Sequence, residues 1–252
     1  MAVYDAIGTG YAVARRADPR IAARLLEALG DAVTVLDVGA GTGSYEPKDR
    51  QVVAVEPSQV MLAQRPAGAA PAIRAAAEAL PFPDGTFDAA MGVLTVHHWT
   101  DKRRGLAEVR RVTRGRIVMF TGFNRDLNTS WWLHDYFPAI RRLVGSRIVP
   151  PETYAAVLGP SEVITVPIPA DCTDGFEAAY WRRPEAVLDP ARWQASSAFT
   201  MISEADRAEG MARLSADLES REWHRRYGHL LDLGELDLGY RILVARSVAG
   251  QD

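Results

Sequence analysis

The chain has 252 residues, a formal net charge of −3 and a pI near 6.0, a balance that gives no electrostatic reason to expect nucleic acid or an anionic membrane as a partner. Its single cysteine, Cys172, excludes an internal disulfide and a cysteine zinc cluster. The chain lacks both an apolar run of roughly 18 residues and a signal-peptide pattern, so we expect a cytoplasmic protein, monomeric or homodimeric.

The first predicted elements are a helix and a buried strand. Asp18 and Pro19 precede apolar residues at helical spacing, and Gly30 follows them, a pattern typical of a capped amphipathic helix. Residues 33–38 form an apolar, β-branched run, which predicts a strand of a parallel sheet.

A glycine-rich turn follows that strand. Asp37 is succeeded by Gly39, Gly41 and Gly43 in the spacing G-x-G-x-G. The dinucleotide fingerprint G-x-G-x-x-G places its third glycine one residue later, so this spacing disfavours a nicotinamide cofactor. Glycines in such a turn let the backbone approach a ligand closely.

A second apolar run, residues 52–56, ends in Glu56. A carboxylate at the tip of this strand can accept hydrogen bonds from both hydroxyls of a ribose, and charged hydrogen bonds contribute roughly 1.5–3 kcal/mol each. Residues 44–50, between the two strands, leave room for only one turn. Together the glycines and the acid predict a nucleoside-cofactor site with an unusually short loop beside it.

The remaining elements alternate between strand and helix, which predicts a parallel, doubly wound α/β sheet. We expect Ser58 to cap the next helix. Residues 236–246 suit a last, antiparallel strand with 163–166 as its partner, which leaves 169–236 as an insertion with a helix beginning at Ser203. The intervening elements are expected at 72–75 (strand), 86–96 (strand), 101–113 (helix) and 116–121 (strand).

Three motifs in this order resemble those of class I S-adenosylmethionine (SAM)-dependent methyltransferases. They are L-D-V-G-A-G-T-G at 36–43, V-E-P-S at 55–58 and A-E-A-L-P-F-P-D-G-T-F-D at 77–88. The third is similar to a signature of the small-molecule branch related to ubiquinone and menaquinone biosynthesis. The resemblance implies a seven-stranded, mostly parallel sheet with an α-helical cap, SAM as cofactor and S-adenosylhomocysteine as product. It covers residues 33–121 and says little about 123–236.

The resemblance also implies which residues hold SAM. Asp37 should orient the amino group, the glycine turn should lie against the methionine part, and Glu56 should bind the ribose. The family pattern has an aspartate where this chain has Ala76, so the side-chain bond to the adenine amino group is missing. The backbone N–H of Ala77 can still meet the ring, and Glu78 could partly substitute. The expected cofactor contacts are Tyr11, Asp37, Gly39, Ala40, Gly41, Thr42, Glu56, Pro57, Ala77, Glu78 and Leu94.

His97 and His98 follow the strand at 86–96, at the edge of the sheet where ligands bind. A histidine can serve as general base for the acceptor, so both are candidate catalytic residues. The alternative is that one packs under the loop and the other bonds to backbone. We expect no metal, because adjacent histidines in a strand point opposite ways and no third ligand has metal-site spacing.

Aromatic residues gather in two segments without a place in the sheet, 127–143 and 169–236. Two adjacent tryptophans on a helix cannot both face one core, so at least one should line a cleft or a lid. We expect both segments to close over the methyl group, although these rings could also be ordinary core. The expected acceptor walls are Trp131, Trp132, Tyr136 and Tyr180, and Asp174 is expected to cap the helix after it.

These expectations divide the chain into a SAM-binding core (1–122), a lid segment (123–162) and the last two strands with a cap insertion (163–252). The predicted function is SAM-dependent methyl transfer to a small, aromatic or hydrophobic metabolite, with oxygen, nitrogen and carbon acceptors all open. The alternative is a SAM-binding protein of the same fold without methyl transfer, such as a pericyclase or a regulator. A nicotinamide oxidoreductase is a third possibility, which the glycine spacing disfavours.

Overall fold

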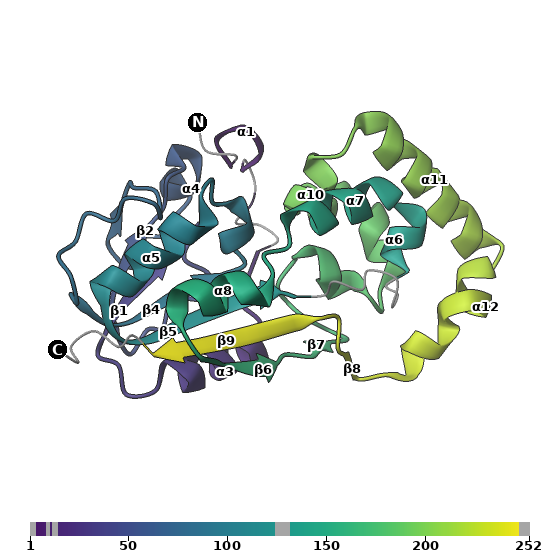
Figure 1. The fold of residues 1–252 in the computed structure, drawn as a ribbon. Helices are drawn as coiled ribbons and strands as arrows, with labels where there is room; N and C mark the ends of the chain where they lie inside the picture. The colour runs from purple at the N-terminus through teal and green to yellow at the C-terminus, as the bar shows by residue number, and fades with distance from the viewer. Residues whose placement is uncertain (1–3, 9–10, 12–14, 124–131, 247–252) are drawn as a thin grey trace.

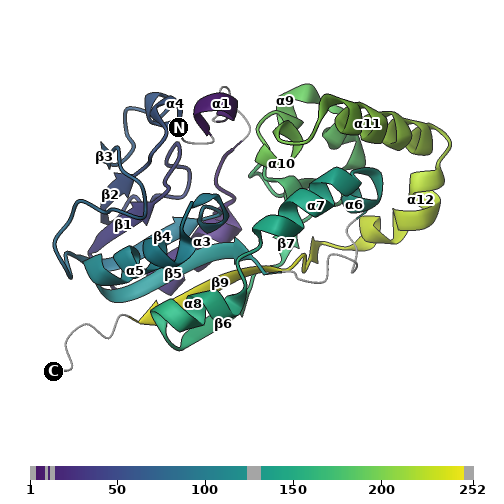
Figure 2. The same ribbon diagram turned by 45° about the horizontal axis from the view of Figure 1, so that its top comes forward.

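A computed structural model describes residues 4–8, 11, 15–123 and 132–246. Figures 1 and 2 show two parts side by side: a sheet flanked by helices, and a smaller group of helices that we call the cap (residues 132–147 and 168–236). None of the helices within these described ranges is long and apolar enough to cross a membrane.

The main sheet has seven strands in the order β3-β2-β1-β4-β5-β9-β6. β9 pairs antiparallel with both of its neighbours, and the remaining strands share one direction. The predicted fold class, including the pairing of the last strand with the segment near 163–166, is confirmed. The strands are β1 (Thr34–Val38), β2 (Gln51–Val55), β3 (Ala72–Ile73), β4 (Phe87–Val93), β5 (Thr113–Gly122), β6 (Ser161–Thr165) and β9 (Tyr240–Arg246).

Helices cover both faces of the sheet because successive strand residues point to opposite sides. Val35 of β1 packs into a buried cluster with Leu25 of α3 (Pro19–Leu29), whereas the next residue, Leu36, packs with Leu106 of α5 (Lys102–Val112) and with α8 (Pro151–Leu158). Burying each such side chain stabilises the fold by roughly 1.5–3 kcal/mol. Figure 1 shows α5 and α8 on one side of the strands and α3 on the other.

Three helices begin where the sequence predicts, two of them at predicted caps, Asp18 and Ser58. The side chains of Asp18, Ser58 and Ser203 accept hydrogen bonds from backbone N–H groups in the first turns of α3, α4 (Gln59–Ala63) and α11 (Glu204–Glu219). A cap of this kind contributes about 1 kcal/mol to stability. Residues 44–50 form turns without a helix or strand, as their length and Pro47 predict.

The cap is closed at its base by a two-stranded ribbon in which β7 (Ile168–Pro169) pairs with β8 (Glu235–Leu236). Its interior is aromatic: Trp132, Trp181 and Trp223 are each fully buried. The Trp132 indole N–H donates to the carbonyl of Trp181 at 2.6 Å. The other cap elements are α6 (Leu133–Tyr136), α7 (Pro138–Arg147), η2 (Glu177–Tyr180), η3 (Pro184–Leu188), α9 (Pro190–Trp193), α10 (Ser197–Thr200), α12 (Glu222–Tyr227) and η4 (Gly228–Asp232).

Candidate active site

The chain reverses its winding between β1 and β4, since β2 and β3 lie on one side of β1 and the later strands on the other. Ligands of open α/β sheets bind at such a switch point, outside the carboxyl ends of the strands. A cavity of about 430 Å³ lies there, which we call the cofactor cavity. Every residue that the sequence led us to expect at the cofactor lines it, from Tyr11 and Asp37 to Leu94.

The glycine turn lines the cofactor cavity through Gly39 and Gly41. Gly39, Gly41 and Gly43 all have positive φ angles, at 72°, 56° and 85°. At Gly39 a Cβ atom would lie 1.9 Å from the Oγ1 of Thr95, so no side chain fits there. The turn is therefore built for a conformation and a close approach that only glycine tolerates.

Glu56 stands directly after β2 with only 5% of its surface exposed. One carboxylate oxygen accepts from the N–H of Gly41 at 2.9 Å, and the other accepts from the N–H of Ser58 at 2.8 Å. Burial raises the pKa of Glu56, and the two backbone N–H groups oppose that shift. These bonds fix the plane of the carboxylate and leave a second lone pair on each oxygen for a diol.

Asp37 is the second buried acid, 3% exposed at the end of β1. Burial, reinforced by the charge of nearby Glu46, raises the pKa of Asp37 to about 8. A carboxyl group in this state gains most from a cation, because pairing offsets the cost of burying its charge. The site therefore suits a ligand that carries an ammonium group.

An ion pair that the sequence did not reveal is hydrogen-bonded to the glycine turn. Arg65 pairs with Glu46, and both side chains are 7% exposed. Arg65 also donates to the carbonyl of Gly41 at 3.2 Å. Glu46 lies in the short loop after β1, whereas Arg65 follows α4, 19 residues further along the chain. No local pattern could therefore have predicted the contact.

Ala76, Ala77 and Glu78, which follow β3, also line the cofactor cavity. Ala77 is 5% exposed, and one Glu78 oxygen accepts from the N–H groups of Thr100 and Asp101 at 2.7 and 3.0 Å. Glu78 thus holds the loop that begins α5. An adenine bound here would meet a backbone edge and this fixed loop.

The N-terminal segment lies over the cofactor cavity. Figures 1 and 2 both show α1 (Tyr4–Ile7) between α4 and the cap. Tyr4, Tyr11 and Arg15 line the cavity, and Arg15 donates to the hydroxyl of Tyr11 at 2.5 Å. Arg15 had no distinguishing signal in the sequence, because its partner in the cap lies far along the chain.

A second cavity of about 150 Å³ adjoins the first, and we call it the acceptor cavity. Four residues line both cavities: Tyr4, Arg15, Leu94 and His98. Leu94 has a φ angle of 51°, in the left-handed region that side-chain-bearing residues rarely adopt. Such strain is found mainly where the surrounding structure enforces it at a functional site. The two cavities therefore meet at a constrained point directly after β4.

His97 and His98 lie in a short 3-10 turn, η1 (Val96–His98), rather than in a strand. Their rings are 4.0 Å apart, so the prediction that they point in opposite directions is wrong. Burial, together with the charge of Arg147, lowers the pKa of His97 to about 4, and burial lowers the pKa of His98 well below its ordinary value. Both imidazoles are therefore neutral near pH 7, and each keeps one unprotonated ring nitrogen.

Both segments expected to form the acceptor pocket contribute to the acceptor cavity, but through other residues. His134 and Leu143 come from the first segment, and Phe176 and Ala198 from the second. Trp132, Tyr136 and Tyr180 are 0%, 1% and 3% exposed and lie outside the lining of both cavities. The structure corrects that prediction: Trp132 and Tyr136 meet edge to face inside the cap, and the Tyr180 ring lies against the guanidinium groups of Arg183 and Arg192. Trp131 lies outside the described residues.

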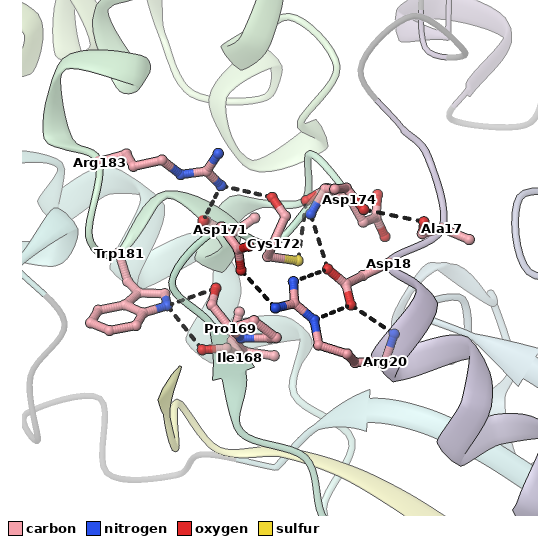
Figure 3. Close-up of polar contacts among 12 residues, drawn as sticks. Ala17, Asp18, Arg20, Ile168, Pro169, Asp171, Cys172, Asp174, Trp181 and Arg183 are labelled. Atoms are coloured by element: carbon pink, nitrogen blue, oxygen red, sulfur yellow. Dashed lines mark hydrogen bonds and ion pairs between the residues drawn. The ribbon is translucent and has the colours of Figure 1, made fainter. Parts of the chain in front are cut away.

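Asp174 is a second correction, since it does not cap η2. Its buried carboxylate binds Arg15 at 2.5 and 3.2 Å and accepts from the hydroxyl of Tyr45 at 3.0 Å. Figure 3 shows the neighbouring contacts, in which Arg20 bridges Asp18 at the start of α3 and Asp171 in the cap. The segment around Asp174 thus joins the cap to the N-terminal segment and the short loop.

Known proteins share this fold and these motifs. The family described as a methyltransferase domain matches residues 36–119. The crystal structure of a protein described as a methyltransferase from an antibiotic biosynthesis pathway of Anabaena variabilis ATCC 29413 is 32% identical, with a TM-score of 0.86, covering 92% of this chain and 98% of that one. The chain therefore belongs to the class I SAM-dependent methyltransferases.

Two further similarities are more distant. The chain is 29% identical over 114 residues to 2-methyl-6-phytyl-1,4-hydroquinone methyltransferase 2 of Oryza sativa subsp. japonica, which is 41% of this chain and 32% of that protein. The chain thus matches about a third of the length of this curated relative. The cyclase SpnF has a TM-score of 0.53 at 21% identity, covering 92% of this chain and 81% of that one, which shows the fold alone.

Proposed function

We propose that this protein transfers the methyl group of SAM to a small molecule bound in the acceptor cavity. The observation that carries the proposal is the junction of the two cavities at Leu94 and His98. A donor in one cavity and an acceptor in the other would meet there. Membership of the methyltransferase family supports the proposal. The family alone does not identify the acceptor, which is inferred from the cavity.

The residues of the cofactor cavity fit SAM. Glu56 would accept from both ribose hydroxyls, Asp37 would pair with the amino group, and the glycine turn would contact the methionine part. When bound, SAM supplies a methyl group on a positively charged sulfur, which leaves as a neutral thioether. The chain's own contribution is alignment and exclusion of water, and positioning of this kind can lower the barrier by roughly 7–11 kcal/mol.

His98 is the residue best placed to take a proton from the acceptor. Its Nε2 lies 3.2 Å from the hydroxyl oxygen of Tyr4, and its buried Nδ1 has no hydrogen-bond partner among the described residues. If Nε2–H donates to Tyr4, the lone pair on Nδ1 remains unpaired and is the one that would take the proton. The His97 ring lies against this ring at a tilt of 48°, and His97 lines the acceptor cavity only. We therefore assign His98 the role of base and His97 a positioning role.

The acceptor cavity suits a small and largely apolar molecule. Leu143, Val144, Ile148 and Phe176 form much of its wall, and its volume of about 150 Å³ is modest. The rice relative is named for an aromatic hydroquinone that carries a phytyl chain. An aromatic or hydrophobic acceptor is consistent with both observations.

The test is a methyl-transfer reaction between purified protein, SAM and a fractionated extract of small metabolites. The proposal predicts a metabolite whose mass rises by one methylene unit, together with formation of S-adenosylhomocysteine. The reaction should be about 10²–10⁴-fold slower with the His98→Ala variant, because that variant lacks the base. Tight binding of SAM without any methylated product would favour the alternative of a SAM-binding protein that performs another reaction.

A further inference from the structure

Two arginines line the acceptor cavity, and their surroundings differ. Arg15 is neutralised by the fully buried carboxylate of Asp174, through contacts of 2.5 and 3.2 Å. Arg147 donates from Nη1 to the Sδ of Met201 at 3.1 Å, and sulfur is a weak acceptor that carries no charge. No carboxylate among the described residues forms an ion pair with Arg147.

The acidic side chain that lines the same cavity, that of Glu177, contacts a histidine rather than Arg147. The Oε1 of Glu177 lies 3.5 Å from the Nε2 of His134, so its nearest basic partner is that ring. On the other side, Arg147 is near enough to both histidines of η1 for its charge to lower the pKa of His97 and of His98. Arg147 therefore brings to this cavity a positive charge that no carboxylate among the described residues pairs with.

The position of Arg147 explains how the fold tolerates this charge. It is the last residue of α7, and the carbonyl end of a helix stabilises a nearby cation. Partly buried cations are otherwise costly unless paired. A guanidinium group presents a planar fork of donors that matches a carboxylate or a phosphate. The neighbouring wall, with Leu143, Val144 and Ile148, is apolar.

We propose that the acceptor is an amphiphilic acid, with an apolar body against this wall and a carboxylate or phosphate held by Arg147. The inference rests on the proposed function, because it names the substrate class of the same site. Arg147 would then be a specificity-determining residue. His97 and His98 are neutral, and Arg15 is paired with Asp174, so the anionic group would pair with the single positive charge of Arg147.

The test measures binding in the presence of saturating S-adenosylhomocysteine, so that it needs no turnover. The probes are 3-phenylpropanoate and octanoate, their primary amides, and phenyl phosphate, each titrated calorimetrically. The amides keep size and shape but remove the charge, and phenyl phosphate separates a phosphate preference from a carboxylate preference. The variants are Arg147→Met, Arg147→Lys and the matched control Arg142→Met, which removes an exposed arginine from the same helix.

We expect at least one of the anions to bind about tenfold tighter than the amides or more, since charge-assisted bonds are roughly twice as strong as neutral ones. Arg147→Met should abolish that difference, Arg147→Lys should keep part of it, and Arg142→Met should leave it unchanged. Affinity for S-adenosylhomocysteine should be the same in all variants. Equal binding of acids and amides, a preference that survives Arg147→Met, or no binding by any probe at millimolar concentration would overturn the proposal.

This design separates the two levels of the account. An acid preference that depends on Arg147, in a protein that methylates nothing, would leave the substrate class standing and remove the proposed function. Methylation of a neutral metabolite without any acid preference would do the reverse. Each result is read from a different instrument, calorimetry in one case and mass spectrometry in the other.

Discussion

The hydroxyl oxygen of Tyr4 lies 3.2 Å from the Nε2 of His98, and the two rings meet edge to face with centroids 5.1 Å apart. The contact joins the N-terminal segment to the turn after β4, at the point where the two cavities meet. It gives the imidazole one fixed orientation when the N-terminal segment covers the cofactor. In this account, covering the cofactor and setting the base are therefore one event.

His98→Ala should lower turnover by about 10²–10⁴-fold, the usual effect of removing a general base, while SAM affinity changes little. Tyr4→Phe should lower turnover less, because the base remains but its orientation is lost. Turnover and calorimetric SAM binding measure the two quantities separately, once an acceptor is known.

The pH dependence adds a second check on His98. Because burial holds the pKa of His98 well below its ordinary value, the ring stays neutral as the pH falls. An ordinary histidine has a pKa of about 6.5 and would lose activity as a base below that pH. Turnover of this protein should therefore not drop as the pH falls through about 6.5. Near-parent turnover in both His98→Ala and His97→Ala would instead mean that the pair is structural.

Asp37 should release a proton when SAM binds at pH 7. Burial raises the pKa of Asp37 to about 8, so the carboxyl is mostly protonated in the free protein, and a bound ammonium would favour its charged form. Calorimetry of SAM binding in buffers of different ionisation enthalpy should show release approaching one proton at pH 7 and little at pH 9. Asp37→Asn should abolish the release and weaken binding; a binding enthalpy independent of buffer would contradict this role.

The same shift predicts a stability effect with a definite sign. The folded state holds the Asp37 proton more tightly than the unfolded chain, so this residue lowers stability as the pH rises from about 4 towards 8. The melting temperature of Asp37→Asn relative to the parent should therefore increase over that range. A constant difference across it would show that the carboxyl is not buried as described.

Glu56→Gln should weaken SAM binding by tenfold or more. The amide keeps the shape but loses the charge, and each charged hydrogen bond contributes about 1.5–3 kcal/mol. Glu162→Gln, which alters an exposed acid on the edge strand β6, is the matched control and should bind SAM as the parent does. Equal affinities for the two variants in calorimetry would remove Glu56 from the site.

Gly39→Ala should destabilise the protein and abolish SAM binding. The φ angle of Gly39 is 72°, and a Cβ atom there would lie 1.9 Å from the Oγ1 of Thr95. Gly68→Ala is the control, because a Cβ atom at Gly68 meets nothing within 4 Å. Thermal unfolding and SAM titration of both variants check the prediction, and a Gly39→Ala protein that melts and binds like the parent would refute it.

The sequence predicted most of what depends on local pattern. The strand before the glycines, the acid after β2, the caps at Asp18 and Ser58 and the helix start at Ser203 were all expected, because each signal lies within a few residues of its effect. The number of strands and their mostly parallel arrangement followed from the resemblance. The expected strand 86–96 was too long, since its last residues turn into η1.

What failed depends on contacts between distant segments. Asp174 sits ahead of a short helix and so looked like a cap, but its partner Arg15 is 159 residues away. Trp132 looked like a pocket wall because its neighbour in sequence is also a tryptophan. Its actual surroundings, Trp181 and Trp223, come from other parts of the cap and bury it completely. Aromatic density indicates a core or a cavity equally well until those partners are known.

The central claim is that donor and acceptor meet at the junction lined by Tyr4, Arg15, Leu94 and His98. A crystal structure of the protein with S-adenosylhomocysteine tests it most directly. We expect the ribose on Glu56, the amino group on Asp37 and the sulfur at this junction, facing the acceptor cavity. A sulfur atom that faces away from Leu94 and His98, or a ligand outside the cofactor cavity, would contradict it.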